Sequence, residues 1–378
     1  MIHFIKKIKS DYSIFRNILK LTDKKIPVIF YSEGRFYQKF SYSLVDLLAK
    51  KYPNQVYYVS SDVNDRLEDL KVNNLFIGKG ILMNIFFSIV KAKFFFLTLT
   101  DLNNHSIKKN KNVEKYIYYN HSGSSTFQSY TEGSFDNYDI ILCNGQYQLD
   151  EIRFRENKKN LVKKNLVLTG YFYFDYISKK IKFNETADEI LVAPSWSYKY
   201  KNFINENVID VIDELIKKNY KVNFRPHPEH FKRSENILKT IKDKFNLFHN
   251  FKFDSDSENI KSMEKAKCLI TDTSDICLEF MILLNRPVLY LEGIDKIHNE
   301  SYSDFKNFES IEKKFKNKFG SIISKKDIKN IDLSIENSIK EFITKIPDLN
   351  NFKNKYYFNF GKTIEEFEKI WEDKILKS

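Results

Sequence analysis

The stretch from Lys267 to Leu291 constrains the fold most, because it reads as a strand, a polar turn, a helix and a second strand. Cys268 to Ile270 is a short apolar run, typical of a buried parallel strand. Ile276 to Leu284 is apolar at helical length, and Pro287 ends that pattern before a strand begins at Val288. Strands that alternate with helices predict an α/β fold with parallel sheets.

The polar turn inside this stretch consists of Asp272, Thr273, Ser274 and Asp275. A hydroxyl side chain at such a position can cap the helix, while free backbone N–H groups face an anion. In open α/β sheets, ligands bind at the carboxyl ends of strands. We therefore predict that Asp272, Thr273 and Ser274 bind a phosphate group. The alternative is a capped turn that binds no ligand.

A second polar motif, Arg225-Pro-His-Pro228, ends the short strand that starts at Tyr220. Its prolines favour an extended chain on either side of the histidine. Arg225 supplies a forked cation suited to phosphate, and His227 supplies a donor that can be neutral or charged near pH 7. Together with the later turn, the motif predicts a two-sided phosphate clamp.

These motifs belong to an ordered set that extends across most of the chain. The others are His121-Ser-Gly123, Leu168-Thr-Gly-Tyr171 with Asp175, Leu191-Val-Ala-Pro-Ser-Trp196 and Arg286-Pro-Val-Leu-Tyr290. From about residue 28 to 295 the set resembles the CDP-glycerol glycerophosphotransferases, the family of teichoic-acid and capsule polymerases. One departure is that Ser122 separates His121 from Gly123, where the family has adjacent His and Gly. The acceptor is therefore less well specified than the fold.

The resemblance implies a GT-B architecture: two Rossmann-like domains that face each other across a cleft, with a C-terminal helix packed back on the first domain. The expected domains are residues 1–180 for the acceptor, 181–360 for the nucleotide donor, and 361–378 for the last helix. Thr363 and Glu366 are expected to form the capping box of that helix.

The implied reaction transfers glycerol phosphate, or a related alditol phosphate, from a CDP-activated donor to a hydroxyl of a cell-surface glycan or lipid-linked acceptor. By resemblance, His121 is the general base, and His227 is a second catalytic residue beside the phosphate ligands Arg225, Thr273, Ser274 and Asp272. Residues expected to line the nucleotide site or cleft are Gly34, Pro194, Ser195 and Glu279. Two alternatives remain: a GT-B glycosyltransferase that uses a nucleotide sugar, and a non-catalytic scaffold of capsule assembly.

Charge and composition bear on partners and location. The chain has 378 residues, a net charge of +12 and a sequence pI of about 9.1. A basic surface is typical of proteins that bind nucleic acid, anionic membranes or anionic substrates. No zinc-finger or RNA-recognition signature accompanies it, so no nucleic-acid partner is predicted. We expect a cytoplasmic protein, with peripheral binding to the inner face of the membrane as an option, because residues 1–25 lack a secretory apolar region.

No metal or cofactor is predicted. Three cysteines, Cys143, Cys268 and Cys277, have neither metal nor disulfide spacing and are expected to be buried thiols. Asp254-Ser-Asp256 is similar to the Asp-x-Asp of metal-dependent glycosyltransferases. We interpret it instead as a helix cap, with Asp256 and Ser257 before a helix from Glu258, because phosphate bound at a helix terminus needs no metal.

Overall fold

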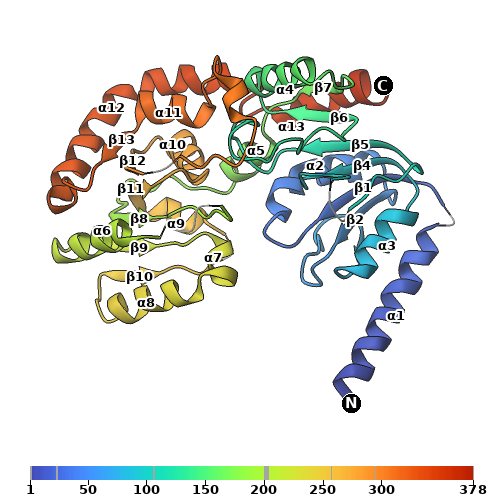
Figure 1. The fold of residues 1–378 in the computed structure, drawn as a ribbon, viewed down its shortest axis with the longest axis horizontal. Helices are drawn as coiled ribbons and strands as arrows, with labels where there is room; N and C mark the ends of the chain where they lie inside the picture. Colours follow the sequence, from blue (N-terminus) through green and yellow to red (C-terminus); the bar gives the residue numbers. More distant parts are fainter. Residues whose placement is uncertain are drawn as a thin grey trace. The chain divides into compact units, whose positions relative to one another are not determined.

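The computed structural model describes residues 2–22, 24–104, 107–199, 204–256, 258–293 and 295–377, with side chains from residue 11 onward except Thr22. The chain divides into two compact α/β units (Figure 1). The first unit comprises Met1–His121, Tyr130–Tyr176 and Tyr356–Ser378. The second comprises Ser122–Ser129 and Ile177–Lys355. The short segment Ser122–Ser129 thus packs with the second unit, although it lies within residues 1–180, the range expected for the first domain.

The first unit is built on a parallel sheet of seven strands in the order β3-β2-β1-β4-β5-β6-β7. Its strands are β1 (Ile26–Ser32), β2 (Val56–Ser60), β3 (Asn73–Phe76), β4 (Ala92–Leu97), β5 (Val113–Tyr119), β6 (Ile140–Cys143) and β7 (Asn165–Leu168). Its helices are α1 (Ile2–Thr22), α2 (Gln38–Lys51), α3 (Ile81–Ile89), α4 (Gln146–Lys158), α5 (Phe172–Ser178), α13 (Thr363–Ile370) and the π-helical turn η3 (Trp371–Ile375). Strand order reverses between β1 and β4, as in a Rossmann fold.

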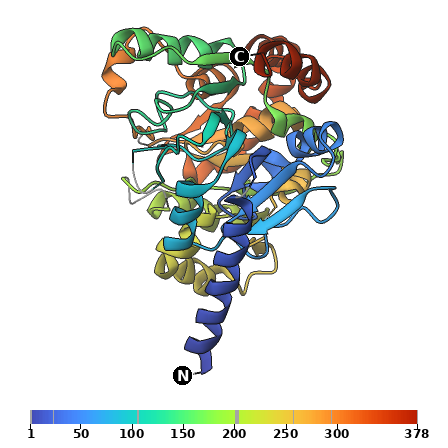
Figure 2. The same cartoon turned by 90° about the vertical axis from the view of Figure 1, so that its right-hand side faces the viewer.

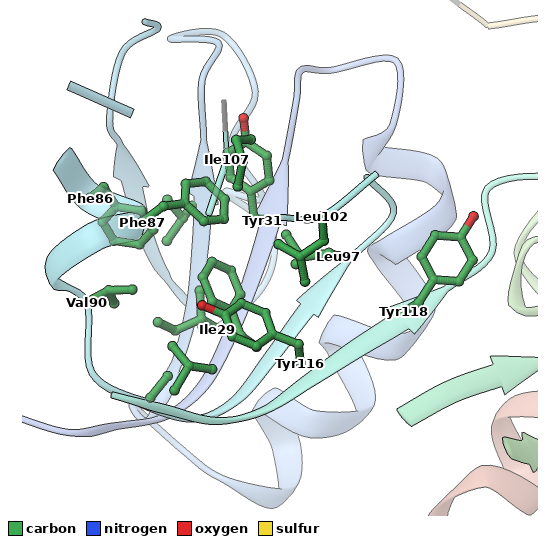
Figure 3. Packing of buried hydrophobic residues seen from close by; sticks show 14 of the residues in the cluster. Ile29, Tyr31, Phe86, Phe87, Val90, Leu97, Leu102, Ile107, Tyr116 and Tyr118 are labelled. Atoms are coloured by element: carbon green, nitrogen blue, oxygen red, sulfur yellow. The ribbon is translucent and has the colours of Figure 1, made fainter. Parts of the chain in front are cut away.

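Two apolar clusters cover the two faces of this sheet. One contains Ile29, Tyr31, Phe87 and Tyr116, and Figure 3 shows these side chains packed together. The other contains Val28, Phe30 and Phe96 and is closed by Trp371 from the C-terminal end of the chain. Alternate residues of β1 therefore point to opposite faces, and both faces are covered, as a parallel sheet requires.

Helix α1 packs on this unit through its C-terminal half, where Ile14, Ile18 and Leu21 join the core beside α3. Figures 1 and 2 both show the N-terminal half projecting away from the sheet. Of the helices that the structure describes, none combines the length and the apolar content needed to cross a membrane.

The C-terminal helix packs on the first unit, as the sequence predicts. Phe367, Trp371 and Ile375 are buried in the sheet's second cluster. The predicted capping box is wrong, because Thr363 is already the first helical residue and its hydroxyl donates to the Asn359 carbonyl at 3.2 Å. Asp175 caps the helix instead, since its Oδ2 accepts the Ile364 N–H at 3.0 Å.

The second unit has a parallel sheet of six strands in the order β10-β9-β8-β11-β12-β13. Its strands are β8 (Glu189–Val192), β9 (Lys221–Phe224), β10 (Phe251–Phe253), β11 (Ala266–Thr271), β12 (Val288–Leu291) and β13 (Ser321–Ile323). Its helices are α6 (Glu206–Lys217), α7 (Pro228–Arg233), α8 (Glu235–Phe245), α9 (Ile260–Lys265), α10 (Ile276–Leu284), α11 (Ile311–Phe319) and most of α12 (Ile331–Tyr356), with the 3₁₀ turns η1 (Tyr302–Phe305) and η2 (Ile328–Asn330). Strand order reverses between β8 and β11.

Candidate functional site

The reversal of strand order between β8 and β11 places two of the predicted motifs beside each other. β8 ends just before Pro194 and Ser195, and β11 ends just before Asp272. The Ser195 N–H donates to both carboxylate oxygens of Asp272, at 3.0 and 3.1 Å. Ligands of open α/β sheets bind at this kind of position, outside the carboxyl ends of the strands where their order reverses.

Asp272 has a structural role at this edge. Its carboxylate accepts the backbone N–H groups of Ser195 and Thr273, the latter at 2.5 Å. Burial raises the pKa of this carboxyl, and the Ser195 hydrogen bonds oppose that rise. Because its oxygens accept hydrogen bonds from both sides of the turn, Asp272 holds the turn in shape. The expected contact of Asp272 with a phosphate stays a prediction.

The turn itself presents donors toward the start of α10. The Thr273 hydroxyl is buried and has no hydrogen-bond partner among the described residues. The backbone N–H groups of Ser274 and Asp275 donate to no described residue either. Buried polar groups of proteins are nearly always satisfied, and helix N-termini attract anions. This turn can therefore accept an anion with several donors at once.

His227 lies at the start of α7 and provides another donor. Its Nδ1 accepts the Glu229 N–H at 3.2 Å, so the proton of the neutral ring is on Nε2. Burial, and then the positive charge of Lys296, lower the pKa of His227 to about 4. The ring is therefore neutral at pH 7. Trp196 stacks near it, with ring centroids 6.4 Å apart.

Arg225, which we expected to face a phosphate, has other partners. Its guanidinium donates to Asp254 at 2.7 Å and to the Asp256 carbonyl at 2.8 Å. The Asp254 carboxylate also accepts from Ser262, so the Asp-x-Asp motif is part of an internal network. The expected helix cap at Ser257 lies outside the described residues, and α9 begins only at Ile260. Arg225 therefore ties the end of β9 to the loop after β10, and its contact with a phosphate stays a prediction.

Sequence reasoning missed two residues of this region. His230 is buried, and its Nε2 lies 3.0 Å from the Ser195 carbonyl, so it ties α7 to the β8 end. The spacing of three residues between His227 and His230, at the start of one short helix, could have indicated that His230 belongs to this region. Lys296 lies in a loop without any motif. Its charge lowers the pKa of His227 and opposes the raised pKa of Asp272, and no described residue forms an ion pair with it.

The remaining expected residues are distributed over both units. Glu279 lies on α10 and accepts from Asn259 at 3.0 Å. His121 and Gly34 belong to the first unit, at the ends of β5 and β1. His121 is surrounded by aromatic rings of the same unit, with centroid distances of 5.7 Å to Tyr37 and 5.9 Å to Tyr130. In the described residues, no three His, Cys, Asp or Glu side chains are grouped as a metal site.

The Thr-Gly motif after β7 has a structural explanation within the first unit. Gly170 has φ of +100°, and a Cβ there would lie 2.2 Å from the Phe358 carbonyl oxygen. Asp175 caps α13, as described above. The motif therefore packs against the C-terminal segment, which explains its residues without a ligand.

Comparison with known proteins identifies the fold. No family model matches the sequence, and no curated protein matches it. The wall teichoic acid polymerase TagF aligns with 100% of this chain and 98% of its own, with a TM-score of 0.57 and 14% identity. The S. aureus MnaA–UDP structure aligns with 93% of this chain and 98% of its own, with a TM-score of 0.59 and 12% identity.

A third structure, the UDP-GlcNAc 2-epimerase from Neisseria meningitidis bound to UDP-GlcNAc, covers 94% of this chain and all of its own, with a TM-score of 0.55 and 12% identity. At these identities the likeness shows the fold. It agrees with the expected α/β architecture and with the resemblance to the glycerophosphotransferases. This chain has the GT-B fold, with two Rossmann-like units.

Proposed function

We propose that the protein transfers an alditol phosphate, such as glycerol phosphate, from a CDP-activated donor to a hydroxyl of a cell-surface glycan or a lipid-linked acceptor. The observation that carries this proposal is the turn from Thr273 to Asp275, where a buried hydroxyl and two backbone N–H groups have no partner in the described part of the chain. A diphosphate satisfies such donors. Support comes from the ordered motifs and from the full-length likeness to TagF, one variant of which was soaked with CDPG.

In this proposal the second unit binds the donor. The Thr273 hydroxyl and the backbone N–H groups of Ser274 and Asp275 contact the diphosphate, and His227 donates through Nε2–H. Lys296 supplies a positive charge, because Arg225 is already paired with Asp254. Pro194, Ser195 and Glu279 shape the nucleotide site. A neutral histidine and a helix terminus stabilise charge that develops on the phosphates without moving protons.

The first unit serves the acceptor, with Gly34 near its binding site. His121 removes the proton of the acceptor hydroxyl, whose oxygen attacks the β-phosphorus of the donor. A new O–P bond forms, the bond between the β-phosphorus and the bridging oxygen breaks, and CMP leaves with the electron pair. An imidazole is the side chain best suited to accept a proton near neutral pH. We assign the transfer reaction to the cytoplasmic face of the membrane, where a lipid-linked acceptor is accessible.

The test is identification of the released nucleotide. The protein is incubated with CDP-glycerol, CDP-ribitol, and UDP- and CMP-sugars, each with a glycan acceptor, in the presence and absence of EDTA. CMP release from a CDP-alditol, retained in EDTA, is the expected result. Release of a nucleoside diphosphate from a nucleotide sugar would instead favour the glycosyltransferase alternative. Binding of CDP-glycerol without turnover would favour the scaffold.

His121→Ala gives the internal control for chemistry. If His121 is the base, kcat falls by roughly 10²–10⁴-fold. Affinity for CDP-glycerol stays near that of the wild type, because the donor groups lie on other residues. A loss of only a few-fold would leave His121 as a residue that positions the acceptor.

A further inference from the structure

Segment Ser122–Ser129 directly follows His121 and packs with the second unit. Two of its hydroxyl groups meet one carboxylate there. Ser122 Oγ donates to Asp275 Oδ2 at 2.9 Å, and Ser124 Oγ donates to Asp275 Oδ1 at 2.5 Å. Asp275 immediately precedes α10 and follows Thr273 and Ser274 of the proposed donor site.

Other residues of the second unit hold the rest of the segment. The Ser125 hydroxyl accepts the Ile311 N–H at 2.8 Å, and the Ser125 N–H donates to Glu312 at 3.2 Å. Phe127 stacks on Phe305, with ring centroids 4.7 Å apart. At its end, the Gln128 and Ser129 carbonyls accept from the N–H and Nδ1 of His298, both at 2.9 Å. At the start of the segment Asp275 holds two side chains, and Ser124 also interacts with Glu312.

A carboxylate is well suited to this position. Both of its oxygens accept hydrogen bonds, so it can bind two hydroxyl donors at once, and bonds to an ionised acceptor are the stronger ones. Its negative charge is also favourable at a helix N-terminus. An amide in its place offers one acceptor oxygen and presents its N–H₂ group to the second serine. An alanine side chain offers no hydrogen-bond acceptor to either serine.

We propose that Asp275 is a positioning residue, which fixes the start of segment Ser122–Ser129 to the turn that carries Thr273 and Ser274. His121 is joined to this anchored segment by a single peptide bond. By fixing the backbone that follows His121, Asp275 therefore affects the transfer step without binding the donor itself. This inference rests on the proposed function for the roles of His121 and of the turn.

The experiment compares Asp275→Ala and Asp275→Asn with the wild type, and uses Glu206→Gln as the matched control. Glu206 is an exposed carboxylate in the first turn of α6, in the same unit, and its side chain bonds to none of the described residues. Three quantities are measured for each protein: amide hydrogen exchange of peptides covering residues 122–129, the Kd for CDP-glycerol, and kcat for CMP release.

For Asp275→Ala we expect exchange in the segment to rise on the order of tenfold or more, since two charge-assisted hydrogen bonds are lost. We expect kcat to fall by about the same factor while the donor Kd changes less than about twofold. Asp275→Asn should give intermediate values of both exchange and kcat, and Glu206→Gln should match the wild type.

Two results would overturn this inference. Unchanged exchange in Asp275→Ala would show that Asp275 does not anchor the segment, and this measurement needs no activity. If exchange is faster but kcat is unchanged, the anchor does not position the base. The same conclusion follows if the donor Kd weakens by as large a factor as kcat falls. A wild-type protein that releases no CMP from any CDP-alditol would instead overturn the proposed function.

Discussion

At the scale of single residues, the protonation state of His227 follows from its surroundings. Its Nδ1 is occupied by the Glu229 N–H, and burial with the nearby charge of Lys296 lowers its pKa to about 4. The ring should therefore act as a neutral hydrogen-bond donor to the diphosphate across the physiological range.

His227→Ala should lower kcat/KM for CDP-glycerol by about 10- to 100-fold. The reason is the loss of a hydrogen bond to a charged group, which contributes roughly 1.5–3 kcal/mol. His249→Ala, an exposed histidine of the same unit, is the control. Between pH 5 and 8, protonation of His227 should not change the donor Kd. The wild type should therefore show no titration step that is absent from His227→Ala. An unchanged kcat/KM, or such a titration near pH 6.5, would contradict the assignment.

Glu312 gives a prediction about stability. Burial, and then the charge of Asp275, raise its pKa from 4.5 to about 7. Between these two values the unfolded chain ionises first, so the folded state binds more protons and its free energy of unfolding falls as pH rises. Glu312→Gln should therefore raise Tm relative to the wild type at pH 8 and have a smaller effect at pH 4.5. An equal effect at both pH values would contradict the raised pKa.

The sequence predicted the position of the polar turn before α10 but not which of its side chains already have partners within the protein. Thr273 and Ser274 follow from the local strand–turn–helix pattern. The hydrogen bonds of Asp272 and Arg225 to Ser195 and Asp254, residues distant in sequence, could not be predicted from residue types, and their phosphate contacts stay predictions. The segment after His121 was missed for the same reason, since Ser122 meets Asp275 across 153 residues.

At the scale of secondary-structure elements, most strands and helices up to residue 291 could be predicted, because apolar runs and Pro or Gly residues delimit them. The strands β3, β7, β10 and β13 and the long helix α12 were not predicted. These four strands have only three or four residues, of which at most one is fully buried, so they carry too little pattern to detect. The C-terminal helix was predicted, but its cap was not, since Asp175 reaches Ile364 from a distant part of the chain.

The docking of this helix can be tested at Gly170. An added Cβ would lie 2.2 Å from the Phe358 carbonyl and 2.6 Å from Thr363 Oγ1. Gly170→Ala should destabilise the first unit by about 2–4 kcal/mol, the range of overpacked core positions with added backbone strain. Gly361→Ala is the control. Its φ is also positive, +76°, but a Cβ there meets nothing within 4 Å, so only the strain of about 1–2 kcal/mol remains.

Thermal unfolding separates the two variants. The drop in Tm should be clearly larger for Gly170→Ala, on the order of 10 °C against a few degrees for Gly361→Ala. Equal drops would mean that contact with the C-terminal segment does not restrict Gly170.

At the scale of the whole molecule, the net charge of +12 predicts reversible binding to anionic membranes. Attraction between exposed charges is screened over about 8 Å at physiological ionic strength, so binding should weaken as salt rises. Co-sedimentation with anionic and with neutral liposomes is the measurement. Equal binding to both, or none to anionic liposomes at low salt, would contradict this prediction.

The central claim is that the turn at the start of α10 binds the donor diphosphate. The most direct measurement is a calorimetric titration of CDP-glycerol into the wild type and into the double variant Thr273→Ala/Ser274→Ala. If the turn binds the diphosphate, the wild type should have a measurable Kd, and the double variant should bind more weakly by about 1–3 kcal/mol, the usual contribution of hydrogen bonds to a charged group. Identical affinities for the two proteins, or an affinity lost in His121→Ala but kept in the double variant, would contradict it.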